Sequence, residues 1–205
     1  PPINRVRAQV QVPQVGSMDE FLRRAPLMLL ASGKPFQYPI SDWGDAVQMI
    51  GPCVLEPGID DVPEWLDAID RPIVLVTTSS ERQADANLVT AALQALADEP
   101  VHVVATMPAG QQPGITSTTN ATVCQFIPHG PVLDRAVCAV THGGMGATQK
   151  ALARGIPVCV VPYGRDQLEV ARRVEVARCG TRLPARRLTP GRLRDKVQEA
   201  MGMVD

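Results

Sequence analysis

The residues best suited to chemistry concentrate in one segment, VTHGGMGATQKALARGIP, at positions 140–157. The segment opens like a strand and then passes through Gly143, Gly144 and Gly146, which let a backbone turn sharply and approach a ligand closely. A helix is expected to begin at this turn, so its free N–H groups and the positive end of its dipole favour an anion, most often a phosphate. His142, at the tip of the strand, could offset charge that grows on a diphosphate leaving group.

The glycine-rich turn also has a simpler interpretation, a tight turn without a ligand beside a hydrogen-bonded surface histidine. Two common nucleotide motifs are missing. The first predicted strand is followed by TTSSE rather than by G-x-G-x-x-G, and the sequence contains no G-x-x-x-x-G-K-[ST] segment. These absences disfavour a dinucleotide-dependent dehydrogenase and a phosphate-loop kinase.

The continuous apolar and β-branched run IVLVTT, at 73–78, is typical of a strand buried on both faces of a sheet, and five further strands are expected after it. Helical spacing recurs between and after them, and strands alternating with helices predict an α/β, Rossmann-like domain with a parallel sheet flanked by helices. In such a sheet, ligands bind at the carboxyl ends of the strands, where chain order reverses. The expected strands cover 73–78, 101–106, 122–126, 137–141, 157–162 and 180–183, and the expected helices cover 85–97, 146–154, 167–178 and a last segment from Pro190.

The residues before this domain differ in character. Within 1–50, Ser17 is expected to cap a short helix. Prolines and glycines punctuate 51–72, which indicates a linker with one short helix near 63–69. The expected organisation is an N-terminal remnant at 1–50, a linker at 51–72 and the Rossmann-like domain at 73–202.

The bulk composition narrows the class of protein. Of 205 residues, 45% are hydrophobic and 20% are charged, so a packed core is expected. The formal net charge of −1 gives no electrostatic case for nucleic-acid binding. Nine lysines or arginines against two acids within 172–196 fit a solvated helical face, or else a surface for an anionic membrane or an acidic partner.

The five cysteines show no C-x-x-C spacing, and three of them lie in apolar runs, where cysteine is usually a small buried hydrophobe. Reduced, structural cysteines fit a cytoplasmic location. No apolar stretch reaches the ~18 residues that span a bilayer, and no basic-then-apolar signal opens the chain. The chain begins Pro1-Pro2 without Met, so we expect a fragment or a processed product.

Residues 126–180 resemble the donor-binding signature of family 1 glycosyltransferases, which have the GT-B fold, and in particular the actinobacterial antibiotic- and glycolipid-type members. The shared motifs are HGG, G-A-T, A-L-x-x-G-I-P, an Asp-Gln pair and an A-R-R helix, in the family's order and spacing. WLDAIDRPIVLVTTSS also resembles the entry into that family's C-terminal domain. The resemblance implies the nucleotide-sugar-binding half of a GT-B enzyme, preceded at 1–50 by the tail of its acceptor-side N-terminal domain.

The resemblance also implies roles for individual residues. His142 would contact the diphosphate and stabilise it as a leaving group, with backbone N–H groups of the glycine-rich turn around it. Asp166 and Gln167 would hold hydroxyls of the transferred sugar, and the backbone of Ile127 would read the edge of the nucleobase. The implied donor-binding residues are Ser79, Ser80, Phe126, Ile127, Pro128, His142, Gly143, Gly144, Met145, Gly146, Ala147, Lys150, Asp166 and Gln167.

Some positions depart from the family pattern or have two interpretations. Lys150 stands where the family usually has a Glu that grips the ribose hydroxyls, and lysine offers donors but no acceptor. It could reach a phosphate instead, or be solvated. Ala147 lacks a hydroxyl that is common there. Asp166 could be an ordinary helix N-cap, His129 a turn histidine or a base contact, and His102 is expected to be structural.

The implied reaction is metal-independent transfer from a UDP- or TDP-sugar, with inversion at the anomeric carbon and without a cofactor. A general base would deprotonate the acceptor hydroxyl, which displaces the nucleoside diphosphate. In this family that base is a histidine near the start of the N-terminal domain, a segment not found here. We therefore expect donor binding without transfer by this chain alone. The implied partners are the nucleotide sugar, a lipophilic acceptor in the complete enzyme, and the missing N-terminal half.

Two further functions stay open. The chain could be a non-catalytic donor-half subunit that works only in complex with a partner. It could also be a nucleotide-sugar epimerase, which shares the GT-B architecture. The Asp-Gln pair and the spacing from HGG to GIP favour the transferase over the epimerase.

Overall fold

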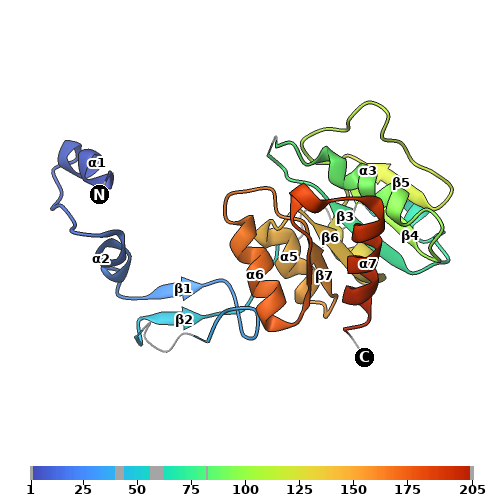
Figure 1. The fold of residues 1–205 in the computed structure, drawn as a ribbon. Helices are drawn as coiled ribbons and strands as arrows, with labels where there is room; N and C mark the ends of the chain where they lie inside the picture. Colours follow the sequence, from blue (N-terminus) through green and yellow to red (C-terminus); the bar gives the residue numbers. More distant parts are fainter. Residues whose placement is uncertain (1, 40–43, 56–61, 82, 204–205) are drawn as a thin grey trace. The chain divides into compact units, whose positions relative to one another are not determined.

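The structure is a computed structural model in which the chain divides into two units (Figure 1). The described residues are 2–39, 44–55, 62–81 and 83–203. The first unit is drawn from Pro1–Lys34 and Pro39–Cys53, and the second from Pro35–Tyr38 and Val54–Asp205.

A six-stranded sheet forms the centre of the second unit (Figure 1). All neighbouring strands are parallel, in the order β5-β4-β3-β6-β7-β8. Every residue of β3 is buried, as the continuous apolar run predicts for a strand covered on both faces. The strands are β3 (Ile73–Thr77), β4 (His102–Thr106), β5 (Ala121–Cys124), β6 (Ala136–Thr141), β7 (Val158–Val160) and β8 (Gly180–Arg182).

Helices cover both faces of this sheet, which confirms the predicted α/β architecture. On one face, Val74 and Val76 pack with apolar residues of α3 (Ala86–Ala95) and α7 (Pro190–Met201). On the other face, Ile73 and Leu75 pack with residues of three helices. These are α4 (His129–Leu133), α5 (Met145–Leu152) and α6 (Gln167–Ala177).

The order of the strands creates a switch point in the middle of the sheet. From β3 the chain adds β4 and β5 on one side, and it then returns to place β6, β7 and β8 on the other side. The carboxyl ends of β3 and β6 are therefore neighbours whose connections leave in opposite directions. This is the position at which open α/β sheets bind ligands.

Element boundaries differ from the sequence-based expectation at a few places. The strand expected at 122–126 ends at Cys124, and the five-residue helix α4 was not predicted because it is too short to show a helical period. The helix expected near 63–69 is a single turn of 3₁₀ helix, η1 (Glu64–Leu66). A second such turn, η2 (Ala185–Arg187), follows β8.

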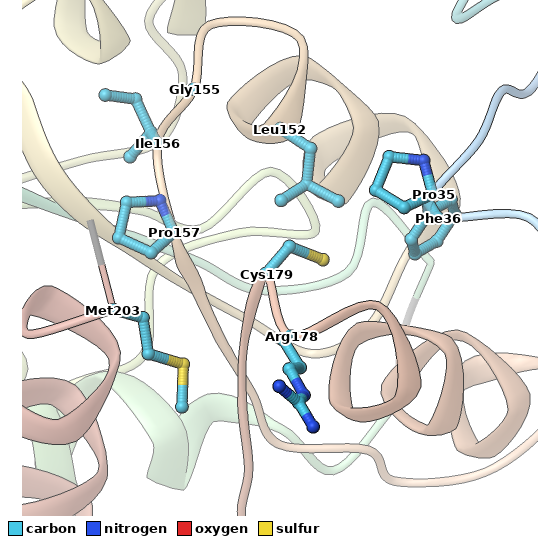
Figure 2. A pocket seen from close by; sticks show the side chains of 9 residues that line it. All are labelled: Pro35, Phe36, Leu152, Gly155, Ile156, Pro157, Arg178, Cys179 and Met203. Carbon is cyan, nitrogen blue, oxygen red and sulfur yellow. The ribbon is translucent and has the colours of Figure 1, made fainter. Parts of the chain in front are cut away.

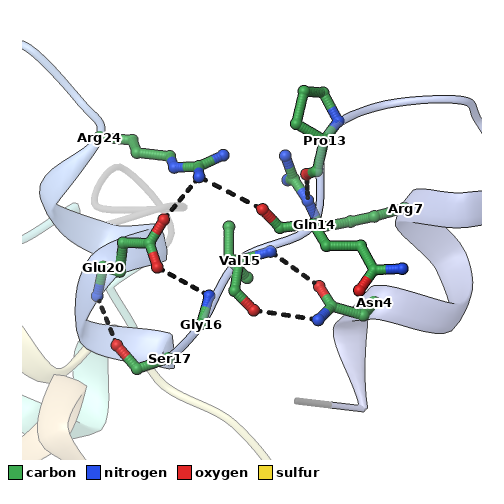
Figure 3. Close-up of polar contacts among 9 residues, drawn as sticks. All are labelled: Asn4, Arg7, Pro13, Gln14, Val15, Gly16, Ser17, Glu20 and Arg24. Carbon is green, nitrogen blue, oxygen red and sulfur yellow. Dashed lines mark hydrogen bonds and ion pairs between the residues drawn. The ribbon is translucent and has the colours of Figure 1, made fainter.

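The first unit contains α1 (Ile3–Gln9), α2 (Met18–Arg23) and a two-stranded parallel sheet of β1 (Met28–Leu30) and β2 (Val47–Met49). Figure 3 shows the polar contacts around the start of α2. The Ser17 hydroxyl accepts the N–H of Glu20 at 3.0 Å, which confirms the predicted cap. The Glu20 carboxylate in turn accepts the N–H of Gly16 at 2.7 Å, and this hydrogen bond is the first cause of the lowered pKa of Glu20.

Little apolar surface is buried within the first unit. None of the described residues of α1 or α2 is buried, and β1 and β2 are at most half-buried. Val15, at 3% exposure, is held at its backbone by the Asn4 side chain through two hydrogen bonds of 3.0 and 3.1 Å. Large apolar side chains are exposed instead, among them Val6, Val10, Leu27 and Leu29.

Candidate functional site

Three buried threonines line the carboxyl edge of the sheet. Thr106, Thr77 and Thr141 are the last residues of β4, β3 and β6, and the strand register places them side by side. The Thr106 hydroxyl donates to that of Thr77 at 2.9 Å. The Thr141 hydroxyl lies 3.3 Å from that of Thr148 in α5 and accepts the N–H of Gly143 at 3.1 Å. In this threonine row, one hydrogen bond joins the end of β4 to the end of β3, and another joins the end of β6 to the glycine-rich turn.

His142 follows β6 directly and packs against the glycine-rich turn. Its side chain is 8% exposed. Gly144 makes room for the ring, because a Cβ there would lie 2.5 Å from Nε2 of His142. Gly143 has a φ of +92°, which favours glycine, and a Cβ there would lie 3.0 Å from the side chain of Val160.

The amino end of α5 carries no side-chain cap. Gly144 is the N-cap residue, and no side chain accepts the N–H groups of the first turn. The amides of Met145, Gly146 and Ala147 therefore have no acceptor within the helix. Gly146 is exposed, and a Cβ there would meet no atom within 4 Å. Uncapped N–H groups and a positive helix end, with the His142 ring beside them, suit an anion.

The charge of His142 depends on its surroundings. Burial lowers its pKa below the ordinary histidine value, while a hydrogen bond with the Thr77 backbone and the carboxylates of Asp85 and Asp166 act in the opposite direction. The imidazole is therefore mostly neutral at neutral pH. A bound diphosphate would favour the imidazolium form, so anion binding and protonation of His142 are expected to be linked.

The turn after β3 carries Ser79 and Ser80. Ser79 is buried; its N–H donates to the Asp85 carboxylate at 2.7 Å, and its hydroxyl oxygen accepts the N–H of Glu81 at 3.0 Å. The hydroxyl hydrogen of Ser79 can still be donated elsewhere, because a serine hydroxyl both donates and accepts. Ser80 is exposed. The Ser79 backbone is therefore fixed by Asp85, and its hydroxyl remains a possible donor in the turn after β3.

The loop after β7 carries Asp166 and Gln167, whose environments differ. Gln167 is 4% exposed, and its amide oxygen accepts the N–H groups of Tyr163 at 2.8 Å and Gly164 at 3.2 Å. Its amide nitrogen donates to the Gln83 side chain at 3.1 Å. Asp166 stands at the N-cap position of α6 without a capping bond, and it is exposed. Asp166 therefore offers a carboxylate to a ligand, whereas the Gln167 amide supports the loop.

The residues expected at the nucleobase follow β5. The Phe126 side chain is 62% exposed, while Ile127 and Pro128 are buried. Ile127 packs in the hydrophobic cluster between the sheet and helices α4, α5 and α6. His129 begins α4, and its Nε2 lies 3.2 Å from the Thr106 hydroxyl, so this histidine joins the threonine row.

The remaining expected residues lie along α5 and at the far edge of the sheet. Ala147 and Lys150 are both half-buried, in the first and last turns of α5. His102 begins β4, and its Nε2 lies 2.9 Å from the Thr122 hydroxyl. Its place at the amino end of the strand, away from the glycine-rich turn, supports a structural role.

An apolar pocket of about 320 Å³ lies at the other edge of the sheet (Figure 2). Leu152, Ile156, Cys179 and Met203 are among the side chains that line it. The first three belong to α5 and to the loops before β7 and β8, which enter the sheet at its amino edge. This pocket includes none of the residues expected to bind a donor, so it is not the candidate site.

The described residues offer neither a cluster of metal ligands nor a membrane-spanning helix. Across 2–39, 44–55, 62–81 and 83–203, no three His, Cys, Asp or Glu side chains are placed to hold a metal ion. Within the same ranges, every helix is too short or too polar to cross a membrane.

Comparison with known proteins places this site in a family. Residues 90–203 match the family described as "Erythromycin biosynthesis protein CIII-like, C-terminal domain". The 4'-demethylrebeccamycin synthase of Lentzea aerocolonigenes is 34% identical over 204 residues, which cover 96% of this chain and 48% of that protein. The chain therefore spans about half the length of this curated relative.

Two solved glycosyltransferase structures also resemble this chain over part of their length. The calicheamicin glycosyltransferase CalG4 matches with a TM-score of 0.76 and 26% identity over 98% of this chain and 52% of CalG4. The glycosyltransferase VinC, solved in complex with DTDP, matches with a TM-score of 0.54 and 28% identity over 70% of this chain and 38% of VinC.

The fold and its relatives define the C-terminal, sugar-donor domain of a GT-B glycosyltransferase, as the sequence resemblance predicted. Within that class, the chain belongs to the family of erythromycin biosynthesis protein CIII-like C-terminal domains.

Part of the site was not foreseen from the sequence. The threonine row had a visible signal, because Thr77, Thr106 and Thr141 each end an apolar strand. Gln83 and Asp85 had none, since their contacts depend on how two loops fold toward each other.

Proposed function

We propose that this chain binds the diphosphate of a nucleotide sugar at the carboxyl ends of β3 and β6 and supplies the donor side of an inverting glycosyl transfer. The observation that carries the proposal is the uncapped end of α5 beside His142. The N–H groups of Met145, Gly146 and Ala147 have no acceptor within the helix, so an anion at this end would accept their hydrogen bonds.

The other strand ends supply the rest of the donor site in this proposal. The Ser79 hydroxyl, with Ser80 beside it, borders the diphosphate. The exposed Asp166 carboxylate accepts hydroxyls of the transferred sugar, and Gln167 holds the loop that presents it. The exposed ring of Phe126 flanks a uracil or thymine base, a choice supported by the DTDP complex of the related VinC.

The proposed reaction needs charge compensation at the leaving group. The acceptor oxygen forms a bond to the anomeric carbon as the bond between that carbon and the diphosphate oxygen breaks. The acceptor proton passes to a general base, and the electron pair of the broken bond leaves with the diphosphate. His142 and the first-turn amides of α5 offset the growing negative charge, which is the reason for proposing a metal-independent reaction.

The acceptor side is proposed to come from a further half, because this chain spans about half the length of its relatives. We assign residues 1–50, apart from Pro35–Tyr38, which belong to the second unit, to the end of an acceptor-side domain, 51–72 to a linker and 73–202 to the donor domain. Exposed apolar residues in the first unit, such as Leu27 and Leu29, support a larger domain around them. Relatives named for rebeccamycin and calicheamicin favour a small-molecule acceptor.

A cytoplasmic location is also proposed. All five cysteines are free thiols. Cys138 and Cys159 lie fully buried in the sheet, and burial raises the pKa of both thiols, which makes them unreactive. Unpaired cysteines of this kind are usual in reducing compartments.

Thermal unfolding in the presence of nucleotides tests the proposal. UDP or TDP should raise the melting temperature, because a ligand at about 100 times its Kd stabilises the folded state by about 2.7 kcal/mol. Uridine and thymidine at the same concentration serve as matched controls without phosphates and should have little effect. Equal shifts with nucleosides and diphosphates, or no shift with either, would contradict a diphosphate site.

A further inference from the structure

Asp85 is a buried carboxylate beside the turn after β3, with 4% exposure. One of its oxygens, Oδ2, accepts the N–H of Ser79 at 2.7 Å and the side-chain amide of Gln83 at 2.9 Å. Asp85 occupies the N-cap position of α3, where an aspartate usually accepts helix N–H groups, but its side chain makes no such bond. The carboxylate therefore serves the strand-end turn rather than its own helix.

The hydrogen bonds continue from this carboxylate to the loop after β7. The side-chain oxygen of Gln83 accepts the Gln167 amide at 3.1 Å, and the oxygen of Gln167 accepts the N–H groups of Tyr163 and Gly164. In the sheet, β6 lies between β3 and β7. The network thus connects the loops on either side of the strand that leads to His142.

The network borders open space rather than a packed core. Gln83 and Asp85 line a pocket of about 600 Å³, together with Thr78, Met107 and Gly110. Side chains of the turn after β3 and of the loop after β4 form its walls. Since the network does not fill the apolar core, its hydrogen bonds serve the geometry of the loops.

We propose that Asp85 is a positioning residue, which together with Gln83 fixes the turn after β3 and the loop after β7 relative to each other. The Ser79 hydroxyl on the first loop and the Asp166 carboxylate on the second then keep a constant separation, so the diphosphate and the transferred sugar are bound as one rigid ligand. This inference rests on the proposed donor binding, and Asp85 itself needs no contact with the donor.

Three variants separate the parts of this network. Asp85→Ala removes the acceptor of both hydrogen bonds. Asp85→Asn removes the charge but retains one oxygen, which can still accept from Ser79 and Gln83 because both bonds go to a single oxygen. Gln83→Ala breaks only the link toward Gln167. The measurements are Kd values for UDP, TDP, UDP-glucose and TDP-glucose by calorimetry, with the melting temperature of each variant.

Asp85→Ala should weaken the binding of all four ligands about tenfold or more, and Asp85→Asn should restore Kd values to within about threefold of the wild type. Gln83→Ala should leave the Kd values for UDP and TDP within about twofold of the wild type. It should reduce the difference in affinity between each nucleotide sugar and its nucleoside diphosphate. In Asp85→Asn, the pKa of His142 followed by NMR should fall, because the Asp85 charge opposes the effect of burial.

Asp134→Asn is the control, since Asp134 is an exposed carboxylate paired with Arg154 outside the network; it should bind like the wild type. If Asp85→Ala folds and binds all four ligands with wild-type Kd values, the inference is overturned. The same holds if its melting temperature falls while its Kd values stay unchanged. If Asp85→Ala does not fold, an unchanged glucose contribution in Gln83→Ala overturns it instead. A wild-type chain that binds no nucleotide contradicts the proposed function itself, which keeps the two failures distinct.

Discussion

At the scale of single residues, the site combines an anion-binding backbone with a histidine whose charge can respond to the ligand. The sequence indicated the glycine-rich turn and His142, but it could not show that the His142 ring is buried against Gly144 or that no side chain caps the start of α5 among the described residues. Those facts depend on the path of the backbone after β6.

The environment of His142 predicts a pH dependence. Because burial lowers its pKa in the folded chain, the neutral form contributes stability that is fully present above the unfolded pKa of about 6.5 and is lost as the pH falls through the folded pKa. A bound diphosphate favours the protonated form instead. Affinity for UDP or TDP should therefore rise as the pH falls from about 8 to about 5.5.

Calorimetric Kd values across this pH range check the prediction, with His142→Asn as the matched variant. The nucleotide's own phosphate titration affects both proteins alike, so the difference between their pH profiles reports on the imidazole. Identical pH profiles for the two proteins would exclude His142 from the linkage.

The roles of Asp166 and Gln167 in binding the sugar stay predictions. The resemblance placed Asp166 and Gln167 together on the sugar, yet the structure gives them different surroundings. Asp166 is exposed and makes no capping bond, while the Gln167 amide is occupied by Tyr163, Gly164 and Gln83. A motif fixes neighbouring positions in the sequence, whereas the direction of each side chain follows from the turn that carries it.

At the scale of elements, the sequence predicted the six strands of the donor-domain sheet and the four longer helices that pack on it. The runs IVLV and AVCAV are apolar up to the threonine that ends each strand, as is usual where both faces of a sheet are covered. The five-residue α4 and the two-stranded sheet of the first unit escaped prediction. Each is too short to establish a period, and tertiary contacts decide its conformation.

Two glycines at equivalent helix positions can test whether the phosphates bind at the uncapped start of α5. Gly146 and Gly191 are each the second residue of a helix, and a Cβ at either would meet no atom within 4 Å. Replacement by alanine should stabilise each folded protein by about 0.5–1 kcal/mol, because alanine has the higher helix propensity. Only Gly146→Ala should weaken UDP and TDP binding, since its methyl group occupies space that the phosphates approach.

Chemical unfolding and calorimetry measure the two effects separately. Gly191→Ala controls for the change in helix propensity. If Gly146→Ala binds both diphosphates as tightly as Gly191→Ala, the phosphates do not lie at the start of α5.

At the scale of the whole molecule, the chain divides into a unit with a substantial core and a unit almost without one. The second unit buries apolar residues on both faces of its sheet, including Phe36 at 7% exposure from the separate segment Pro35–Tyr38. The first unit buries little apolar surface of its own. Stability should therefore reside in the second unit, and Phe36 should contribute to it although it precedes the donor domain in sequence.

Two phenylalanines test this division. Phe36→Ala should reduce the free energy of unfolding by about 3–5 kcal/mol, the usual cost of deleting a buried phenyl ring. Phe126→Ala, at a 62% exposed position, should change stability by less than about 0.5 kcal/mol but weaken nucleotide binding. Urea unfolding followed by circular dichroism measures both. A small effect of Phe36→Ala would show that residues 35–38 do not belong to the core of the second unit.

The central claim, that backbone amides at the start of α5 and His142 bind a diphosphate, is tested most directly by titrating the purified chain with UDP and TDP in a calorimeter. The wild type should bind at least one of them, and His142→Ala should bind it more weakly by about 1.5–3 kcal/mol, roughly tenfold or more in Kd. His102→Ala, which removes a histidine at the opposite edge of the sheet, should have no effect on this Kd. A folded wild-type chain that binds neither diphosphate, or a His142→Ala variant with unchanged affinity, would contradict the account.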